Sequence, residues 1–320
     1  MIITLKDGSK KEYAQAMPII DIVRDISEGL ARVACVGEVD GQVEDLRTVL
    51  DKDCELNILT AKDEAGLAAL RHTASHVMAQ AIKRLYPSAK LAIGPSIADG
   101  FYYDIDFETP ITADDLEKIE AEMKKIIKEA LPLERFTLPR EEALALMKEK
   151  EEPYKVELIE DLPEGEEISF YKQGEFTDLC AGPHLDSTGR VKGNGIKLMN
   201  VTGAYWRGDS KRKMLQRIYG IAFPKKEELD EYLQKQEEAR KRDHNKLGRE
   251  LEYFTTVDCI GQGLPVLLPK WLIPYVVSLH LLAHKSTLLL YVRELHNASC
   301  FEPLQRTALL FLLFGHNQEL

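Results

Sequence analysis

The sequence predicts an α+β fold, with a small β-grasp domain followed by a larger α+β domain and a charged helix. Three observations predict it. The first sixty residues show the order ββαβ…β, a long helical pattern begins near residue 65, and short strands separated by glycine turns follow residue 165. With 320 residues, of which 44% are hydrophobic and 30% charged, the chain is long enough for two or three globular domains.

The first sixty residues carry the signals of the β-grasp domain. The stretch IITLKDGSKKEY contains a β-rich run, a Lys-Asp-Gly-Ser turn and a second run, which predicts a hairpin. A helix is predicted over residues 18–28, because Ile19, Ile22, Val23 and Ile26 follow an early proline at helical spacing. The stretches RVACVGEVDG and CELNILT are typical of strands.

The second domain begins with a helix from about Ala65 to the residues before Pro87. His72 and His76 lie in its middle. Its apolar residues follow a period of 3.6: Leu67, Leu70, Val77, Ala81 and Leu85.

A second helix is predicted from Thr112 onward. Thr112 and Asp115 form a capping pattern, and an apolar stripe follows, made of Leu116, Ile119, Met123 and Ile126. Short strands continue to about residue 224, and residues 225–252 then form a highly charged helix. The charged helix carries a basic patch: Arg240, Lys241 and Arg242.

Charge and cysteine content limit the class of protein. The net charge of −11 excludes a uniformly basic surface but permits a local basic patch for RNA. Five scattered cysteines without a CxxC pair favour a reducing compartment, so we expect a cytoplasmic protein. The first residues lack the features of a signal peptide, and no stretch before residue 264 resembles a membrane span.

Two pairs of potential metal ligands share a spacing of four residues. His72 and His76 lie in the predicted helix, and Cys180 and His184 lie in the loop-like stretch DLCAGPHL. A metalloprotease of the HExxH type is excluded, because the residue after His72 is threonine rather than glutamate. A zinc site made of all four residues and ordinary packing of buried histidines both remain open.

Four longer blocks of the sequence extend these motifs. They are RHTASHVMAQAIKRLYPSAKLAIGPSIADGFYYDID, DLCAGPHL, TGAYWRGDSKRKMLQRIYG and EEARKRDHNKLGRELEYF. Together, and in this order, they resemble the N-terminal half of bacterial threonyl-tRNA synthetase. The resemblance covers about residues 1–270, and the first sixty residues resemble the TGS module that precedes the editing domain in that family.

The resemblance implies a domain that hydrolyses serine wrongly attached to threonine tRNA. Serine is threonine without one methyl group, and one missing methyl contact discriminates by only about 1–3 kcal/mol. A pocket built for threonine therefore admits serine, and a second hydrolytic site must correct the product by rejecting the larger amino acid.

The resemblance also implies which residues form the editing pocket. We expect His72 to activate water, Lys155 to stabilise charge, and Asp178 and His184 to orient substrate. Cys180 is expected to be either a proton-transfer partner or a pocket wall. Without the resemblance, Lys155 would be interpreted as a surface lysine, because glutamates surround it in the sequence. The matching positions are His72, His76, Tyr103, Lys155, Asp178, Cys180 and His184.

The expected partner is the acceptor end of threonine tRNA. Trp206 and Arg207, close to three further basic residues, fit a contact with single-stranded nucleotides, although a structural strand and turn explains them equally well. No membrane partner is expected. Dimerisation is expected only for the full-length family.

The resemblance favours metal-free editing, so no cofactor is expected for this chain, and zinc and ATP are assigned to the family's class II catalytic core. Two alternatives stay open. One is a zinc-dependent deacylase of the alanyl type, with His72, His76, Cys180 and His184 as ligands, and the other is a non-enzymatic RNA-binding or regulatory module.

The resemblance finally implies a domain division. We expect a TGS domain over residues 1–62, an editing domain over 63–224, a linker helix over 225–252, and a truncated or frameshifted start of the class II core over 253–320. The family's pattern is lost from Trp271 onward. We therefore expect a threonine--tRNA ligase fragment without the threonine-activating site, whose only activity is ester hydrolysis.

Overall fold

The computed structural model describes residues 1–256 and 265–270. Residues Met1–Tyr232 form one compact unit, and Leu233–Leu320 form a second. The expectations for residues 271–320 lie outside the described residues. In the part that is described, no helix combines the length and the apolar character needed to cross a membrane.

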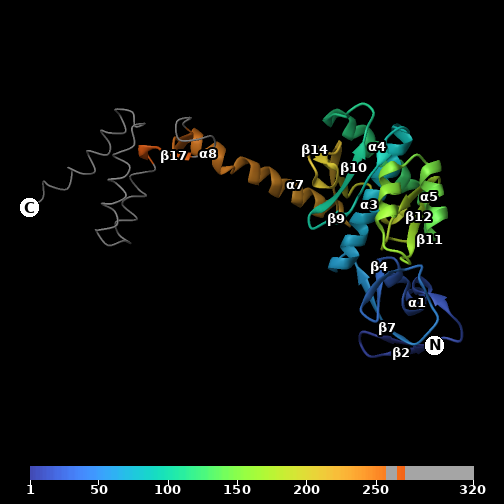
Figure 1. Ribbon diagram of the computed structural model, residues 1–320. Coiled ribbons are helices and arrows are strands. Elements are labelled where there is room, and N and C mark those ends of the chain that lie inside the picture. Colours follow the sequence, from blue (N-terminus) through green and yellow to red (C-terminus); the bar gives the residue numbers. More distant parts are fainter. Residues whose placement is uncertain (257–264, 271–320) are drawn as a thin grey trace, which may run out of the picture. The chain divides into compact units, whose positions relative to one another are not determined.

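The first sixty residues form the predicted β-grasp domain, drawn in blue in Figure 1. Its strands are β1 (Ile2–Leu5), β2 (Lys10–Glu12), β3 (Met17–Pro18), β4 (Ala34–Val39), β5 (Gln42–Asp45), β6 (Val49–Leu50) and β7 (Cys54–Thr60). Its helices are α1 (Ile19–Ile26) and α2 (Glu28–Ala31). The main sheet has the order β2-β1-β7-β4-β5, with β1 and β7 parallel at its centre.

The hydrophobic spacing of this domain explains its packing. The helical face predicted from the sequence is buried at Ile19, Ile22 and Val23, which pack with Ile3 and Leu56 of the sheet. Burial of each such side chain contributes about 1.5–3 kcal/mol. The predicted hairpin is present as β1 and β2.

The second domain packs two long helices against an antiparallel sheet. The helices are α3 (Glu64–Leu85) and α4 (Ala113–Glu129). The strands are β8 (Lys90–Leu91), β9 (Ser96–Ile97), β10 (Gly100–Asp106), β14 (Ile196–Tyr205) and β15 (Met214–Ala222), in the order β14-β15-β10-β8 with β9 beside β10. Thr112 and Asp115 form the predicted capping box of α4, and its predicted apolar stripe is buried.

A small sheet and two short helices complete the second domain. They are α5 (Arg140–Glu149), α6 (Pro153–Asp161), and the antiparallel strands β11 (Leu133–Leu138), β12 (Ile168–Gln173) and β13 (Phe176–Leu179). Strand β13 ends just before Cys180, and α6 carries Lys155 in its first turn. These two elements therefore deliver residues to the site described below. The α+β fold class is confirmed.

The charged segment forms two helices rather than one. Helix α7 (Lys226–Lys241) ends near the basic patch, and α8 (His244–Glu250) begins after it. The Asp243 side chain accepts from the Asn245 backbone N–H at 2.8 Å, which caps a new helix. A short antiparallel pair follows, made of β16 (Phe254–Thr256) and β17 (Pro265–Leu267).

Candidate metal centre

Helix α3 brings two histidines to one face. His72 and His76 are four positions apart, just over one turn, and their ring centroids are 5.3 Å apart. The helix is buried on nearly all sides between Ala69 and Ile82, because it crosses the core of the domain. His76 is fully enclosed, whereas His72 keeps a partly exposed edge.

Cys180 and His184 lie in the loop after β13. The loop turns at Gly182, whose φ of +81° lies in the left-handed region. A Cβ at Gly182 would stand 2.1 Å from the Tyr171 hydroxyl, so both the backbone angle and the available space require glycine. The Gly182 N–H donates to Cys180 Sγ at 3.3 Å. The loop therefore holds the thiol and the histidine at a fixed separation.

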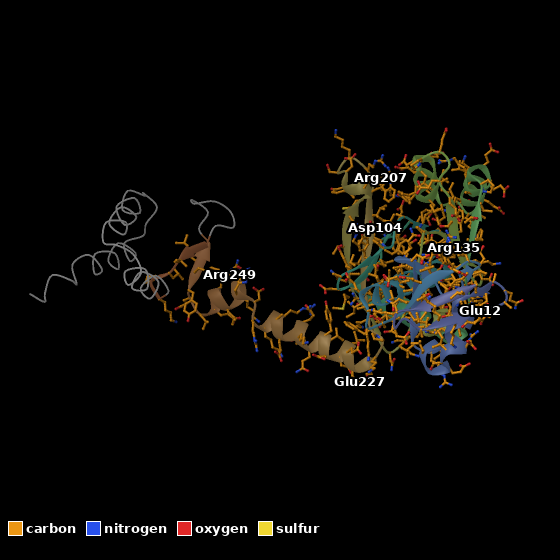
Figure 2. All side chains as sticks on the ribbon, turned by 90° about the horizontal axis from the view of Figure 1, so that it is seen from below. Glu12, Asp104, Arg135, Arg207, Glu227 and Arg249 are labelled. Carbon is orange, nitrogen blue, oxygen red and sulfur yellow. The ribbon has the colours of Figure 1, made fainter. Side chains whose placement is uncertain are left out.

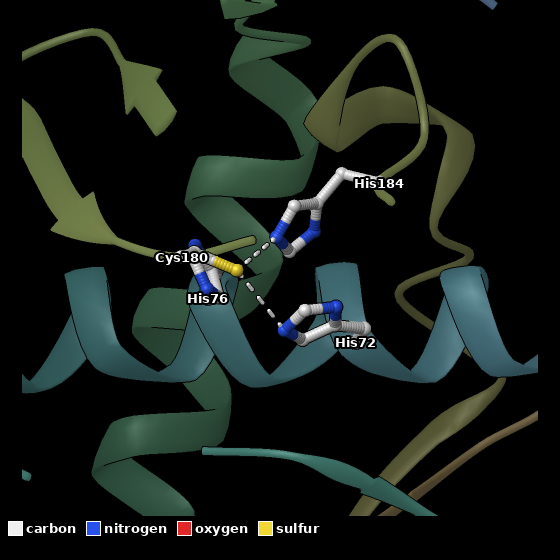
Figure 3. A group of neighbouring side chains, drawn as sticks. All are labelled: His72, His76, Cys180 and His184. Atoms are coloured by element: carbon white, nitrogen blue, oxygen red, sulfur yellow. Dashed lines mark hydrogen bonds between the residues drawn. The ribbon is translucent and has the colours of Figure 1, made fainter. Parts of the chain in front are cut away.

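The two pairs converge into what we call the His–Cys cluster, made of His72, His76, Cys180 and His184. Figure 3 shows the two helix histidines facing the loop residues. One ligand atom from each residue lies within 4.8 Å of all the others. The ring of His184 lies 4.1 Å from that of His72 and 4.2 Å from that of His76. Three imidazoles and one thiol thus surround a single point.

Hydrogen bonds on the far side of the cluster define the protonation of two rings. His72 Nδ1 faces the Pro183 carbonyl at 3.3 Å, and because a carbonyl only accepts, Nδ1 carries the proton. His184 Nδ1 faces Thr73 Oγ1 at 3.2 Å. That hydroxyl already donates to the Ala69 carbonyl and accepts from the Leu185 N–H, so its remaining lone pair accepts from His184 Nδ1–H.

Both rings therefore turn an unprotonated Nε2 toward the same sulfur. Cys180 Sγ lies 3.3 Å from His72 Nε2 and 3.3 Å from His184 Nε2, drawn as dashed lines in Figure 3. A thiol has one proton and cannot donate to both nitrogens. His76 Nδ1 is buried without any hydrogen-bond partner. The cluster therefore has more lone pairs than protons to fill them, and a bound cation would accept those lone pairs.

The expectation that this chain needs no cofactor is therefore wrong. Neutral imidazole and thiolate are preferred zinc ligands. In zinc sites the second ring nitrogen of a histidine ligand usually donates to a protein oxygen, as Nδ1 of His72 and of His184 does here. Sequence reasoning left this possibility open but ranked it second. The number of donor atoms and their mutual distances favour it.

Burial determines the charge of the cluster side chains. Burial lowers the pKa of His76 to about 3 and holds the pKa of His72 and His184 below the ordinary value. These rings are therefore neutral at pH 7, as a metal ligand must be. Burial also raises the pKa of Cys180 to about 12, so the sulfur remains a thiol until a cation displaces its proton.

Three buried polar side chains adjoin the cluster, and we call them the Lys–Asp–Tyr network: Lys155, Asp178 and Tyr103. Lys155 Nζ lies 2.7 Å from Asp178 Oδ1 and donates to the Tyr103 hydroxyl at 3.0 Å, while that hydroxyl donates to Asp178 Oδ2. Lys155 is only 3% exposed. The sequence alone would place this lysine on the surface, whereas the first turn of α6 points it inward.

Asp178 connects the network to the cluster. Its Oδ2 lies 3.7 Å from His76 Nε2. Burial is the largest influence on the pKa of Asp178 and by itself would raise it, but the charge of Lys155, the nearby His76 and the hydrogen bonds from Lys155 and Tyr103 together lower it. Burial, followed by the nearby Asp178 charge, raises the pKa of Tyr103 far above its ordinary value. The network is therefore an ion pair with a neutral phenol beside it.

The structure brings seven of the predicted site residues together and leaves two elsewhere. Trp206 is buried at the end of β14, where its indole N–H donates to Glu157 at 3.0 Å. Arg207 pairs with Glu157 and Asp161, and Figure 2 shows it at the opposite end of the unit from Glu12. The indole makes an edge-type contact with Tyr154, with ring centroids 5.1 Å apart, and its burial argues against base stacking by Trp206.

Sequence reasoning missed the residues that support the cluster. Thr73 stands next to His72 in the sequence, and its polar character in a buried helix is a weak signal of its role. Tyr171 and Asp45 carry no local signal. Tyr171 packs edge-on against His184, with 4.4 Å between ring centroids, and its hydroxyl donates to Asp45.

Comparison with known proteins agrees with this fold and site. One family model, the TGS domain, matches residues 1–60. A second, described as the threonyl and alanyl tRNA synthetase second additional domain, matches residues 168–219 and includes Cys180 and His184. Fold and site thus define a TGS domain joined to a synthetase second additional domain.

Similar curated proteins identify the particular family. Threonine--tRNA ligase of Acetivibrio thermocellus is 63% identical over 271 residues, which are 85% of this chain and 42% of that protein. The enzyme of the same name from Clostridioides difficile is 54% identical over 308 residues, which are 96% of this chain and 46% of that protein. The chain belongs to the threonine--tRNA ligase family and carries its N-terminal TGS and editing-domain region. It spans less than half the length of these relatives.

Proposed function

We propose that this chain hydrolyses the ester bond between serine and threonine tRNA at the His–Cys cluster. The observation that carries the proposal is the convergence of four side chains able to bind a metal, from segments about a hundred residues apart, beside a buried ion pair. Buried ionisable groups gathered at one place mark functional sites. The membership of the family supports the choice of threonine tRNA, whose acceptor end is the proposed partner.

The proposed reaction needs a polarised ester, a water and a proton acceptor. A catalytic zinc keeps one position open, so we assign three of the four cluster residues, His76, Cys180 and His184, to hold it. There it would supply a Lewis acid, which polarises a carbonyl or lowers the pKa of a water. We assign the proton-acceptor role to His72, because it is the partly exposed histidine and its Nε2 is unprotonated. Lys155 provides positive charge next to the site, and Asp178 holds it in place.

Discrimination against threonine has a steric basis in this proposal. The hydroxyl of serine and that of threonine are alike, so the additional methyl group is the feature that a closely packed hydrolytic site rejects. The cluster lies on a buried helix and on a loop fixed by Gly182. Neither element can move aside for an additional methyl group without losing packing contacts.

The test is release of amino acid by the purified chain. We expect release of serine from seryl-tRNA specific for threonine, with threonyl-tRNA left intact, and loss of activity on zinc removal with recovery on zinc addition. Serine attached to alanine tRNA serves as the control for tRNA identity, because preferential hydrolysis of that substrate would indicate a deacylase of the alanyl type. A chain that binds tRNA but releases neither amino acid would instead be an RNA-binding module.

Substitution of His72 tests its role separately. His72→Ala should slow serine release roughly a hundredfold or more, the usual scale for general acid–base assistance, while the zinc content stays at that of the wild type. Cys180→Ser should reduce both zinc content and activity. If His72→Ala also loses the zinc, all four residues are ligands, the coordination sphere is closed, and the proton acceptor must be another group.

A further inference from the structure

The N-terminal domain reaches the loop that carries Cys180 and His184. Asp45, the last residue of β5, is buried although it belongs to the TGS domain. Its Oδ1 accepts from the His184 backbone N–H at 2.7 Å, and its Oδ2 accepts from the Tyr171 hydroxyl. One carboxylate therefore holds two donors of the second domain.

Both donors belong to groups that position the ring of His184. The backbone bond fixes the position of its Cα, and the ring of Tyr171 stands edge-on against its imidazole at 4.4 Å. The Tyr171 hydroxyl also occupies the space beside Gly182, where a Cβ would stand 2.1 Å from it. Asp45 thus restrains the loop through the backbone of His184, while Thr73 holds the ring of His184 at Nδ1.

Two further arginines, one from each domain, donate hydrogen bonds across the contact between the TGS domain and the second domain. Arg47 donates from Nε and Nη2 to the Asp186 carbonyl at 3.3 and 3.0 Å, just beyond the loop. In the reverse direction, Arg190 of the second domain donates to the carbonyls of Ala31 and Ala34. The loop is therefore held between the two domains.

We propose that Asp45 is a positioning residue of the metal centre: supplied by the TGS domain, it fixes the backbone of His184 so that Nε2 points into the His–Cys cluster. Because this role rests on the metal centre in the proposed function, its test measures metal binding directly and does not depend on hydrolysis. Removing such a supporting contact typically weakens metal affinity 10- to 100-fold.

The experiment uses the full chain with three variants. Asp45→Ala removes both acceptors, Asp45→Asn keeps one oxygen for the His184 N–H, and Asp51→Ala removes the same charge from an exposed position of the same domain. The readouts are zinc affinity by chelator competition, the absorption spectrum of the cobalt-substituted protein, and amide hydrogen exchange over residues 180–186 without metal. Circular dichroism checks that each variant is folded.

We expect Asp45→Ala to weaken zinc binding about 10- to 100-fold, to alter the cobalt spectrum, and to accelerate exchange of the His184 amide. Asp45→Asn should show smaller changes, and Asp51→Ala should match the wild type. If Asp45→Ala does not fold, Tyr171→Phe, which removes only the hydroxyl, should still weaken zinc binding and accelerate exchange of the His184 amide.

Unchanged zinc affinity and cobalt spectrum in folded Asp45→Ala or, if it does not fold, in Tyr171→Phe would overturn the proposal, even if exchange becomes faster. A wild-type chain that binds no zinc would overturn the metal centre together with this role. A wild-type chain that binds zinc but releases no serine would overturn the proposed function alone.

Discussion

Lys155 and Asp178 form an ion pair that is almost entirely shielded from water, with both side chains about 3–4% exposed. Such a pair contributes little net stability, because desolvation offsets most of the Coulomb attraction. Removal of one partner alone is strongly destabilising, however, because the other partner is left as an uncompensated buried charge. The pair is therefore better explained by its position beside the cluster than by stability.

We predict that Lys155→Met lowers the free energy of unfolding by about 3–5 kcal/mol, because Asp178 is left buried without its cation. Asp178→Asn should cost a similar amount, and the double variant should be less destabilised than the sum of the two. Urea denaturation at pH 7 measures all three, with Lys148→Met at an exposed position of α5 as the control. Strictly additive effects would show that the two side chains do not interact.

At the scale of elements, Arg84 ties the end of α3 to its neighbours. Its guanidinium binds both oxygens of Glu129 on α4 at 2.7 and 2.8 Å, and its Nε binds Glu175 at 2.6 Å. A weaker contact reaches Glu122 at 3.3 Å. This network keeps the helix that bears His72 and His76 in register with α4 and with the turn before β13.

The Arg84 network predicts an acid-sensitive contribution to stability. Its hydrogen bond with Arg84 is the main cause that lowers the pKa of Glu175 from 4.5 to about 2. A carboxyl group with a lowered pKa in the folded state stabilises the fold above its unfolded pKa, and this contribution is lost as the pH falls from 4.5 toward 2. Solvent screening limits the contribution to about 1 kcal/mol, because Glu175 is largely exposed.

Arg84→Met should therefore be less stable than the wild type by about 1 kcal/mol at pH 7, and the difference should shrink as the pH falls below 4.5. Urea denaturation across this range measures it. Lys128→Met, an exposed position on α4, is the matched control and should show no such pH dependence. A difference between Arg84→Met and the wild type that is constant with pH would contradict the network's role.

At the scale of the whole molecule, the two N-terminal domains are in direct contact, and the first residues of α7 belong to the same compact unit. Residues Met1–Tyr232 form one compact unit, in which Cys35 of β4 packs into the core of the second domain. Gly66 of α3 lies so close to the Thr60 carbonyl that a Cβ would stand 2.0 Å from it. The junction between the domains is thus short and packed.

Among the residues that the structure describes, we predict that trypsin first cuts between Arg240 and Lys246, where the helical hydrogen bonding is interrupted and the basic side chains are exposed. Cutting at Lys62 should be slow, because the Asp63 carboxylate accepts from the Thr60 backbone and hydroxyl and fixes this turn. Mass spectrometry of a digestion time course identifies the sites. Early cleavage at Lys62, with the segment between α7 and α8 intact, would show that the two domains are only loosely joined.

The sequence by itself determined the local features of this protein. Hydrophobic spacing at 3.6 predicted α1, α3 and α4, the capping pattern at Thr112 predicted where α4 begins, and four-residue spacing predicted that His72 and His76 share a face. These features follow from interactions between residues within about one helical turn, which the order of residues specifies directly.

Only the tertiary structure decided what the site contains. His72 and Cys180 are 108 positions apart, and Asp45 lies 139 positions from His184, so their contacts depend on how whole elements pack. Lys155 has the sequence surroundings of a surface residue, and its burial beside Asp178 results from the docking of α6. The candidate metal centre is indicated by four donor side chains that have too few protons to satisfy one another, and this shortage arises only once the fold has brought those side chains together.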